Sequence, residues 1–299
     1  MILSVGEILA DMIGTEGESG FFYERKAGGA PFNVACAIKK MGGNCAFVGS
    51  VGNDLVGDFL IKTVADMQID GIVEKLNSRN TTLAFVNLDA SGERSFCFYR
   101  KHTADYVMPA ITDELFAKAT IIHFGSLMLS EEDGRAYLKK EMQRARDASK
   151  IISFDVNFRS DIFPDKQTAV DIYKEYIKYA DVIKFSQDEV ELFSQEYVNQ
   201  LSLTKLVCVT LGEKGSCWMY NGKTNNIASI KVSTVDTTGA GDAFYGAFLS
   251  QIDGCEWSPE LFDNACRFGN VCGALNTTKR GAVDALPTFE QVNQLVKTL

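Results

Sequence analysis

The sequence lacks the features that mark nucleic-acid-binding and membrane-bound proteins. It has no run of Lys or Arg longer than two, and its 299 residues carry a formal net charge of −9, which disfavours contact with nucleic acid or an anionic membrane surface. No apolar stretch approaches the roughly 20 residues of a membrane span. The chain begins with a strand-like pattern and not with a charged leader and cleavage site. We therefore expect a soluble cytoplasmic protein that acts on a small molecule.

Signals for zinc or disulfide bonds are also missing. The chain contains only two histidines, and its eight cysteines include no C-x-x-C pair, so a zinc site or a disulfide framework is not favoured. We expect the cysteines to be small buried apolar residues of a protein from a reducing compartment. They are Cys36, Cys45, Cys97, Cys208, Cys217, Cys255, Cys266 and Cys272.

Two common nucleotide-binding motifs are absent. There is no G-x-x-x-x-G-K-[ST] segment, and the nearest approach to G-x-G-x-x-G places Phe244 where the third glycine belongs. A P-loop protein is therefore excluded, and an NAD-dependent dehydrogenase loses its main support.

What the sequence does contain is an alternation of strand-length apolar runs with amphipathic helical stretches, which is typical of βαβ units around a parallel sheet. The fold class is therefore α/β. Strands are predicted at residues 2–9, 45–51, 120–124, 150–155, 182–185 and 206–210. Helices are predicted at 31–41, 54–67, 131–148, 167–179, 240–252, 258–275 and 288–298.

One segment has a different pattern. Residues 81–100 form two alternating runs around an Asp89-Ala-Ser-Gly92 turn, which indicates a β-hairpin. Together with the polar and aromatic stretch 14–26 it predicts a small antiparallel sheet inserted at two places into one large domain, 1–299. This appendage, built from about 12–30 and 80–108, would be well placed to act as a lid.

The segment with the most chemical content is Val235-Asp-Thr-Thr-Gly-Ala-Gly-Asp-Ala-Phe244. Gly239 and Gly241 allow a tight turn that points amides outward at a helix N-terminus, which favours anion binding. Asp242 in the first turn would repel a phosphate, but it suits a base that takes a proton from a hydroxyl while the amides of Gly239, Ala240 and Gly241 hold the transferring group. Taken alone, Asp242 could equally be an acid favoured by the helix dipole.

A second glycine-rich segment, Gly28-Gly-Ala-Pro-Phe-Asn-Val-Ala35, precedes a predicted helix. Gly28 and Gly29 permit an unusual turn, and Pro31 presets the start of a helix whose inward face carries Asn33. The simpler alternative is a turn followed by a helix start.

In this order, the two segments closely resemble the two signatures of the ribokinase-like (PfkB) family of sugar kinases, and the resemblance extends over nearly the whole chain. It implies a three-layer α/β/α sandwich with a mostly parallel central sheet and a small antiparallel β lid. It also implies phosphoryl transfer from ATP to a primary hydroxyl, with Asp242 as base and Mg²⁺ neutralising the phosphates. The diglycine would be a hinge for the lid, and Asp11 and Asn33 would contact the sugar.

The resemblance also assigns a nucleotide site. Thr210 to Gly215, with Gly212 between them, would lie beside the nucleotide together with Gly239 and Gly241, and Asn270 would form the wall of the adenine site. Glu189 would organise the water molecules of Mg²⁺. This chain has Ser186 where the family usually has Asn, as in plant-like fructokinases. A K⁺ ion beside Asp236, Thr238 and the loop around Gly281 is an expectation from the resemblance alone.

Fructose is the leading substrate, because Phe98 to Asp105, residues 122–126 and residues 281–288 resemble the fructokinase branch. However, Arg100 and Arg159 could grip a carboxylate, so a 2-keto-3-deoxygluconate kinase is the alternative, followed by an aminoimidazole riboside kinase. Either arginine could instead form an ion pair. A non-catalytic nucleotide- or sugar-binding regulator is an alternative of a different class. Pairing of the lids of two subunits would cover apolar surface, so a homodimer is expected.

Overall fold

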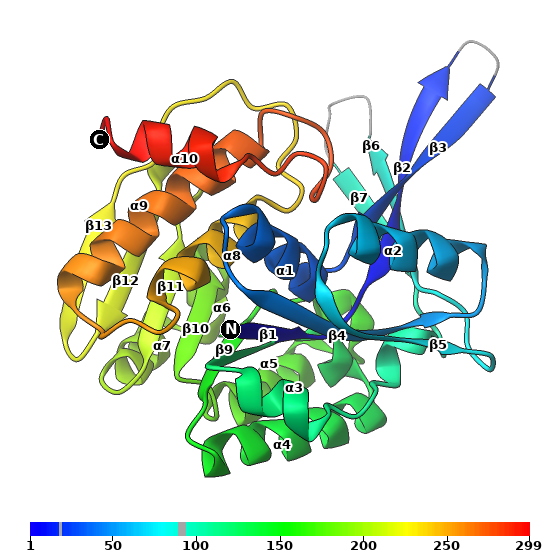
Figure 1. The fold of residues 1–299 in the computed structure, drawn as a ribbon, viewed down its shortest axis with the longest axis horizontal. Coiled ribbons are helices and arrows are strands. Elements are labelled where there is room, and N and C mark those ends of the chain that lie inside the picture. Colours follow the sequence, from blue (N-terminus) through cyan, green and yellow to red (C-terminus); the bar gives the residue numbers. More distant parts are fainter. Residues whose placement is uncertain (18–19, 89–93) are drawn as a thin grey trace.

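A nine-stranded sheet lies at the centre of the molecule (Figure 1), as seen in a computed structural model that describes residues 1–17, 20–88 and 94–299. Its strand order is β13-β12-β11-β10-β9-β8-β1-β4-β5. The pairings from β11 to β5 are parallel, whereas β12 and β13 extend one edge in the antiparallel sense. The bounds are β1 Ile2–Val5, β4 Cys45–Gly52, β5 Asp70–Leu76, β8 Ile121–Phe124, β9 Ile151–Asp155, β10 Val182–Ser186, β11 Leu206–Thr210, β12 Ser216–Tyr220 and β13 Lys223–Ile227.

Helices cover both faces of this sheet, so the predicted three-layer α/β/α arrangement is confirmed (Figure 1). One core is formed with α1 Ala30–Lys40, α2 Leu55–Asp66, α8 Ala240–Ile252, α9 Pro259–Asn276 and α10 Phe289–Val296. The other is formed with α3 Asp113–Lys118, α4 Glu132–Asp147, α5 Lys166–Ile177, α6 Gln187–Phe193 and α7 Gln195–Ser202.

Successive residues of the central strands point alternately into the two cores. Ile121 and Val182 pack with the α1 and α8 side, while Ile122 and Ile183 pack with the α4 and α5 side. A strand that is buried on both faces is apolar at most of its positions. This is why the central strands were recognisable in the sequence as short continuous apolar runs.

A second, four-stranded sheet has the order β3-β2-β6-β7, with β2 Leu9–Gly17, β3 Gly20–Gly28, β6 Leu83–Leu88 and β7 Arg94–Tyr99. It consists of two antiparallel hairpins whose inner strands, β2 and β6, pair in parallel. The β2–β3 hairpin projects from the body of the molecule (Figure 1). The predicted hairpin within 81–100 is confirmed as β6 and β7, while its Asp89-Ala-Ser-Gly92 turn lies outside the described residues.

Residues 2–9 were predicted to form one strand, but they form the junction between the two sheets. β1 ends at Val5, and Leu9 already belongs to β2 of the second sheet. The chain turns at Gly6, whose φ is 154° and where a Cβ would come within 2.5 Å of the Pro31 ring. This break allows one short segment to place side chains between the two sheets.

Three strands of the central sheet were missed, namely the edge strands β5 and β13, and β12, which lies between β11 and β13. β5 is largely exposed and carries charged residues, so it has no apolar run. β12 and β13 form a hairpin around Asn221 and Gly222, both with positive φ. An Asn-Gly pair is a known signal for a two-residue hairpin turn, so this hairpin was predictable from the sequence.

Five of the eight cysteines are buried, as expected, but Cys97 and Cys255 are exposed. Cys97 lies on β7 at the edge of the second sheet, and Cys255 lies in the connection after α8. All eight thiols are free. Within the described ranges, none of the helices has both the length and the apolar character that crossing a membrane requires.

Candidate active site

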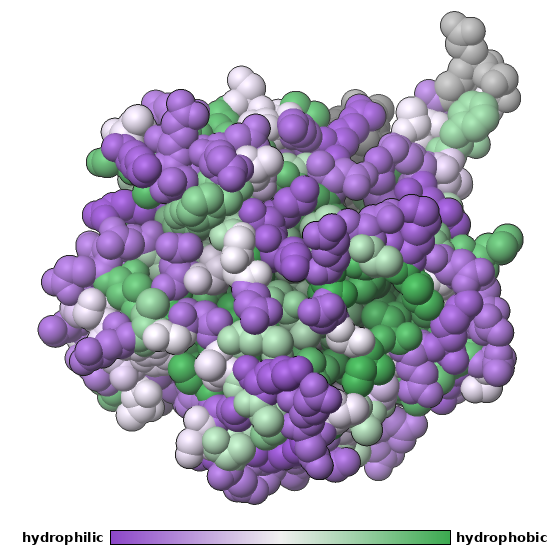
Figure 2. Space-filling model, in the orientation of Figure 1, coloured by the Kyte–Doolittle hydropathy of each residue, from purple (hydrophilic) through white to green (hydrophobic). Residues whose placement is uncertain are grey.

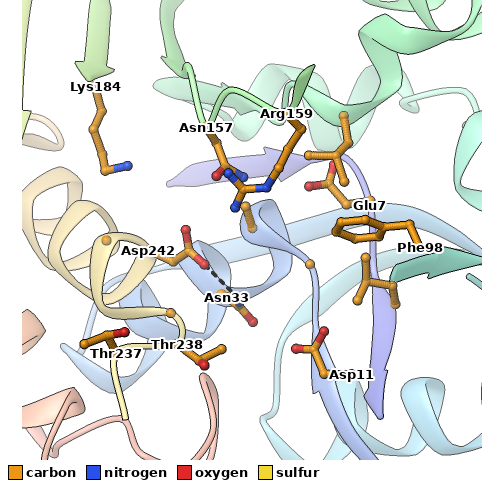
Figure 3. A pocket seen from close by; sticks show the side chains of 16 residues that line it. Glu7, Asp11, Asn33, Phe98, Asn157, Arg159, Lys184, Thr237, Thr238 and Asp242 are labelled. Carbon is orange, nitrogen blue, oxygen red and sulfur yellow. Dashed lines mark hydrogen bonds between the residues drawn. The ribbon is translucent and has the colours of Figure 1, made fainter. Parts of the chain in front are cut away.

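A cavity of about 450 Å³ lies between the central sheet and the second sheet (Figure 3). This volume falls in the usual range for sites that bind small molecules. Many of the predicted site residues meet here, namely Asp11, Gly29, Asn33, Arg159, Thr238, Gly239, Gly241 and Asp242. The sequence analysis had assigned no role to further lining residues, which include Glu7, Leu127, Asn157 and Lys184.

The N-terminus of α8 forms one end of the cavity. Gly239 is the N-cap residue, in the left-handed conformation with φ 72°, and a Cβ there would come within 2.5 Å of the Ala282 side chain. Only glycine meets both conditions without strain. Gly239 and Gly241 line the cavity. The amide of Ala240 instead donates to the carbonyl of Thr237 at 3.2 Å, so this N–H is used within the turn.

Asp242 lies in the first turn of α8 and also lines the cavity. Asn33, from α1, donates a hydrogen bond from Nδ2 to Oδ2 of Asp242 at 2.8 Å. Burial raises the pKa of Asp242 above its ordinary value, while Lys184, the Asn33 hydrogen bond and Arg159 oppose that rise. A carboxylate with a raised pKa that stays ionised is suited to accept a proton from a hydroxyl.

Lys184, in the middle of β10, provides a positive charge for which no role was predicted. Its Nζ donates to both oxygens of Asp155, at 2.9 and 2.8 Å, and both side chains are buried. Burial alone would lower the pKa of Lys184, but Asp155, Glu189 and Asp242 hold it above its ordinary value. A Cβ on Gly241 would lie 3.4 Å from Nζ, so the ammonium adjoins the helix N-terminus. The available signal was an acid at the end of one apolar strand and a lysine inside the next.

Asp11 lies on β2 on the side of the cavity that the second sheet forms. Burial, with the charges of Asp242 and Asp236, raises the pKa of Asp11 to about 7. Gly28 packs directly against it, because a Cβ on Gly28 would come within 2.2 Å of Oδ2 of Asp11. The first glycine of the diglycine therefore leaves room for the carboxyl group, and the second, Gly29 with φ 106°, provides the turn into α1.

The two candidate arginines have different environments. Arg159 is exposed and lines the cavity. Arg100 is buried, forms an ion pair with Asp105 at 2.6 Å and donates to the carbonyl of Leu127 at 2.9 Å. Arg100 does not belong to the cavity lining, and the ion-pair alternative describes its contacts.

Two of the predicted nucleotide-binding residues, Gly239 and Gly241, line the cavity, whereas the others do not. Ser186 and Thr210 are paired across β10 and β11, and Gly212 and Gly215 follow in the turn after β11. Asn270, on α9, donates to the carbonyl of Ile227 at 2.9 Å. Ser186 caps α6, and Thr210 donates to the carbonyl of Phe185 at 3.4 Å. In this geometry the polar side chains of the set therefore bind neighbouring backbone.

The two predicted metal-binding groups also tie loops together. Glu189 accepts hydrogen bonds from the amides of Phe158 and Ser186, at 2.6 and 2.7 Å. Asp236 accepts from the amides of Thr238 and Gly281, at 2.7 and 3.0 Å. Within the described residues no group of three or more His, Cys, Asp or Glu side chains is arranged to hold a metal ion.

The sequence was compared with known families and proteins. Residues 1–289 match the model of the pfkB family carbohydrate kinases. The chain is 39% identical to probable fructokinase-5 of Arabidopsis thaliana, with 100% of this chain and 98% of that protein covered. It is 38% identical to fructokinase-2 of Oryza sativa subsp. japonica, with 99% and 94% covered.

Solved structures give the same result. Fructokinase from Xylella fastidiosa with bound ATP is 31% identical and superposes with a TM-score of 0.93, covering 99% of this chain and 98% of that one. Fructokinase from Vibrio cholerae O395, in a form with fructose, ADP and calcium ion bound, is 30% identical with a TM-score of 0.89, covering 99% and 98%. The resemblance inferred from the two glycine-rich segments is thereby confirmed, and the chain belongs to the pfkB family of carbohydrate kinases.

Proposed function

We propose that this carbohydrate kinase is an ATP-dependent fructokinase that transfers the γ-phosphoryl group of ATP to the C6 hydroxyl of D-fructose. The observation that carries the proposal is the placement of Asp242, held by Asn33, between an anion-binding helix terminus and a group of sugar-side carboxyls. Support for fructose comes from the relatives named fructokinase, and support for ATP from the solved structure that contains it.

In this mechanism Asp242 takes the proton from the attacking hydroxyl as the phosphoryl group is transferred in line. The N-terminus of α8 and the ammonium of Lys184 stabilise the negative charge that spreads over the phosphoryl oxygens. Gly239 and Gly241 are the amide donors that face the cavity. No phosphorylated enzyme is required.

Magnesium enters as the partner of ATP, and its charge neutralises the phosphates. The donor chemistry of Glu189 fits a role in the outer coordination sphere, because each carboxylate oxygen accepts one amide and retains a lone pair for a metal-bound water. Asp236 and Thr238 supply oxygen atoms of the kind that hard cations prefer, in a turn tied to Gly281. We also propose that a K⁺ ion binds at this turn.

The second sheet is proposed to close over the sugar. Asp11 and Phe98, from β2 and β7, already line the cavity. Gly28 ends β3, and Gly29 joins this strand to α1. Rotation at this diglycine would bring the sheet down and exclude water, which otherwise competes with the sugar as acceptor.

One observation favours a second candidate, the 2-keto-3-deoxygluconate kinase. The exposed guanidinium of Arg159 lines the cavity and suits a carboxylate better than a neutral hydroxyl. Fructose remains the first proposal, because Asp11 and Glu7 give the same cavity two buried carboxyl groups that would repel an acid when ionised.

We also propose that the protein forms a homodimer and is located in the cytoplasm. The projecting β2–β3 hairpin exposes Phe21, Phe22 and Tyr23, and β7, at the opposite edge of the second sheet, exposes Tyr99, each by 42% or more. Figure 2 shows apolar surface on the projecting hairpin. A second copy of the same sheet would cover these rings. Eight free thiols suit a reducing compartment.

The proposed activity is tested by measuring ADP release in a coupled assay. The purified protein is supplied with ATP, Mg²⁺ and, in turn, fructose, 2-keto-3-deoxygluconate, ribose, adenosine and aminoimidazole riboside. Asp242→Asn prepared in parallel reports contaminating kinases. Fructose is expected to give the highest kcat/KM. Turnover of the acid sugar alone would replace fructokinase by the second candidate, and no turnover of any sugar would favour a non-catalytic binding protein.

A further inference from the structure

Glu7 is a buried carboxyl group that the proposed mechanism does not use. It follows the break after β1, and its exposed fraction is 1%. Within the described part of the chain neither Oε1 nor Oε2 has a hydrogen-bond partner. Buried carboxyl groups are normally paired or hydrogen-bonded, because a group without partners loses its hydration and gains nothing in return. The missing hydrogen-bond partner of Glu7 is therefore expected to come from a bound ligand.

The backbone around Glu7 is held closely by glycines. A Cβ on Gly29 would come within 2.5 Å of the Glu7 carbonyl oxygen, and a Cβ on Gly125 would come within 2.8 Å of Oε2. Neither position tolerates a side chain without displacing Glu7. Glu7 is thus packed closely against the backbone at Gly29 and Gly125, which limits the positions that its carboxyl group can take toward a ligand.

Glu7 faces the cavity at the sugar side. It is one of the lining residues, together with Asp11 and Phe98 of the second sheet. Figure 3 shows Glu7 and Phe98 at one end of the cavity, while Lys184 lies at the opposite end and Asp242 between them. A ligand that reaches Asp242 with its reacting hydroxyl can therefore extend the rest of its ring toward Glu7.

Arg100 provides a complementary group nearby. Its Nη2 is also buried and has no hydrogen-bond partner among the described residues, while its other nitrogen atoms bind Asp105, Leu127 and Ser130. Burial raises the pKa of Glu7 to about 8, and the positive charge of Arg100 opposes that rise. The carboxyl acceptor of Glu7 and the Nη2 donor of Arg100 thus interact electrostatically but form no hydrogen bond with each other.

We propose that Glu7 is a sugar-specificity residue, whose carboxyl group hydrogen-bonds a hydroxyl of the bound sugar that is not the hydroxyl phosphorylated. The inference rests on the proposed function, since it takes the ligand to be the sugar acceptor. A hydroxyl both donates and accepts, so it satisfies Glu7 in either protonation state. Arg100 acts as a positioning residue, because its positive charge lies near the carboxyl group of Glu7.

The consequence is discrimination by hydroxyl group. A site that contains a buried hydrogen-bonding group rejects an analogue lacking the matching hydroxyl, because the group is then left unpaired. Wild-type protein should therefore bind one fructose analogue lacking a single hydroxyl about 10-fold or more weakly than fructose. This hydroxyl is the one that Glu7 contacts.

The test compares wild-type, Glu7→Met and Glu7→Gln by calorimetry with fructose and with analogues that each lack one hydroxyl. Methionine retains approximate size but no hydrogen-bonding carboxyl, so Glu7→Met should bind fructose about 10-fold more weakly and bind that one analogue within roughly threefold of fructose. Glutamine retains donor and acceptor and should keep the discrimination. Glu141→Met is the matched control, since Glu141 is equally buried but lies on α4, and it should behave as wild type.

Several outcomes would overturn the inference. One is a Glu7→Met protein that binds fructose like wild type. Another is a loss of affinity by the same factor for every analogue and for ATP, with a lower melting temperature, which would indicate a structural role. If Glu7→Met does not fold, Glu7→Ala is measured on the same panel against the same criteria. Failure of the wild-type protein to phosphorylate fructose would instead contradict the proposed function, and the comparison would move to the sugar that is phosphorylated.

Discussion

Asn33 and Asp242 are joined by a 2.8 Å hydrogen bond although 209 positions separate them in the chain. The bond forms because α1 and α8 approach closely at Gly246, where a Cβ would come within 2.6 Å of both the Val34 carbonyl and the Ala37 side chain. The amide of Asn33 donates, so it stabilises the ionised form of Asp242. Helix packing thus gives the candidate base a hydrogen bond that opposes the rise in its pKa caused by burial.

The first prediction concerns Asp242. The Asp242→Asn variant keeps the size of the side chain but removes the proton acceptor, so folding and ATP binding should persist while kcat falls ~10²–10⁴-fold. Steady-state kinetics and calorimetry with ATP measure the two effects. A folded variant within a few-fold of wild-type turnover, or a change confined to KM, would show that Asp242 is not the base.

The second prediction concerns pH. Asp242 must be ionised to act, so activity should fall as pH decreases through its pKa. The Asn33 hydrogen bond lowers that pKa, and Asn33→Ala should therefore move the acidic limb of the kcat profile to higher pH. Asn264→Ala, at an exposed position of α9, is the control. An unchanged acidic limb in Asn33→Ala would mean that another group titrates there.

The third prediction separates a neutral sugar from an acid sugar. Asp11→Ala should raise KM for fructose by roughly 10-fold, the cost of losing a buried hydrogen-bonding group, while Arg159→Ala should have a smaller effect. Kinetics with fructose and 2-keto-3-deoxygluconate decide between them. If Asp11→Ala leaves fructose unaffected and Arg159→Ala abolishes use of the acid sugar, the fructokinase assignment fails.

The fourth prediction concerns stability. Burial raises the pKa of Glu7 from 4.5 to about 8 in the folded protein. The free energy of unfolding is therefore highest below about pH 4.5, where Glu7 is protonated in both states, and it falls as pH rises to 8. Glu7→Gln cannot ionise. The difference in free energy of unfolding between Glu7→Gln and wild type should therefore increase by a few kcal/mol from pH 4.5 to pH 8, because one pKa unit corresponds to about 1.4 kcal/mol. Urea denaturation at pH 5 and pH 9, without sugar, measures the change; a constant difference would contradict it.

The fifth prediction concerns assembly. If the exposed rings of the β2–β3 hairpin pair with those of a second copy, the protein should sediment as a dimer at micromolar concentration. Changing Phe21 and Phe22 together to Ser should give a monomer, whereas Leu203→Ser, which alters an equally exposed apolar residue after α7, should not. A wild-type protein that remains a monomer would remove the paired sheets but leave the kinase.

Much of the active site could be predicted because its parts are short contiguous motifs. The turn before α8 needs glycine for its backbone angles, and Asp242 directly follows the second glycine of the motif, Gly241. By contrast, Arg100 was considered a ligand of the substrate, but its contacts depend on Asp105 and on the loop at Leu127. No periodicity in the sequence records which buried acid an arginine meets.

The sequence by itself determined the layered α/β fold, the hairpin at 81–100 and the helix terminus with its aspartate. These follow from local requirements, namely apolar runs that must be buried on two faces and turns that only glycine adopts. Tertiary structure decided which charges meet in the cavity. The break at Gly6 placed Glu7 between the two sheets, and the pairing of β9 with β10 brought Asp155 to Lys184. Such contacts arise only when distant strands pair, because burial and charge depend on neighbours that are remote in the chain.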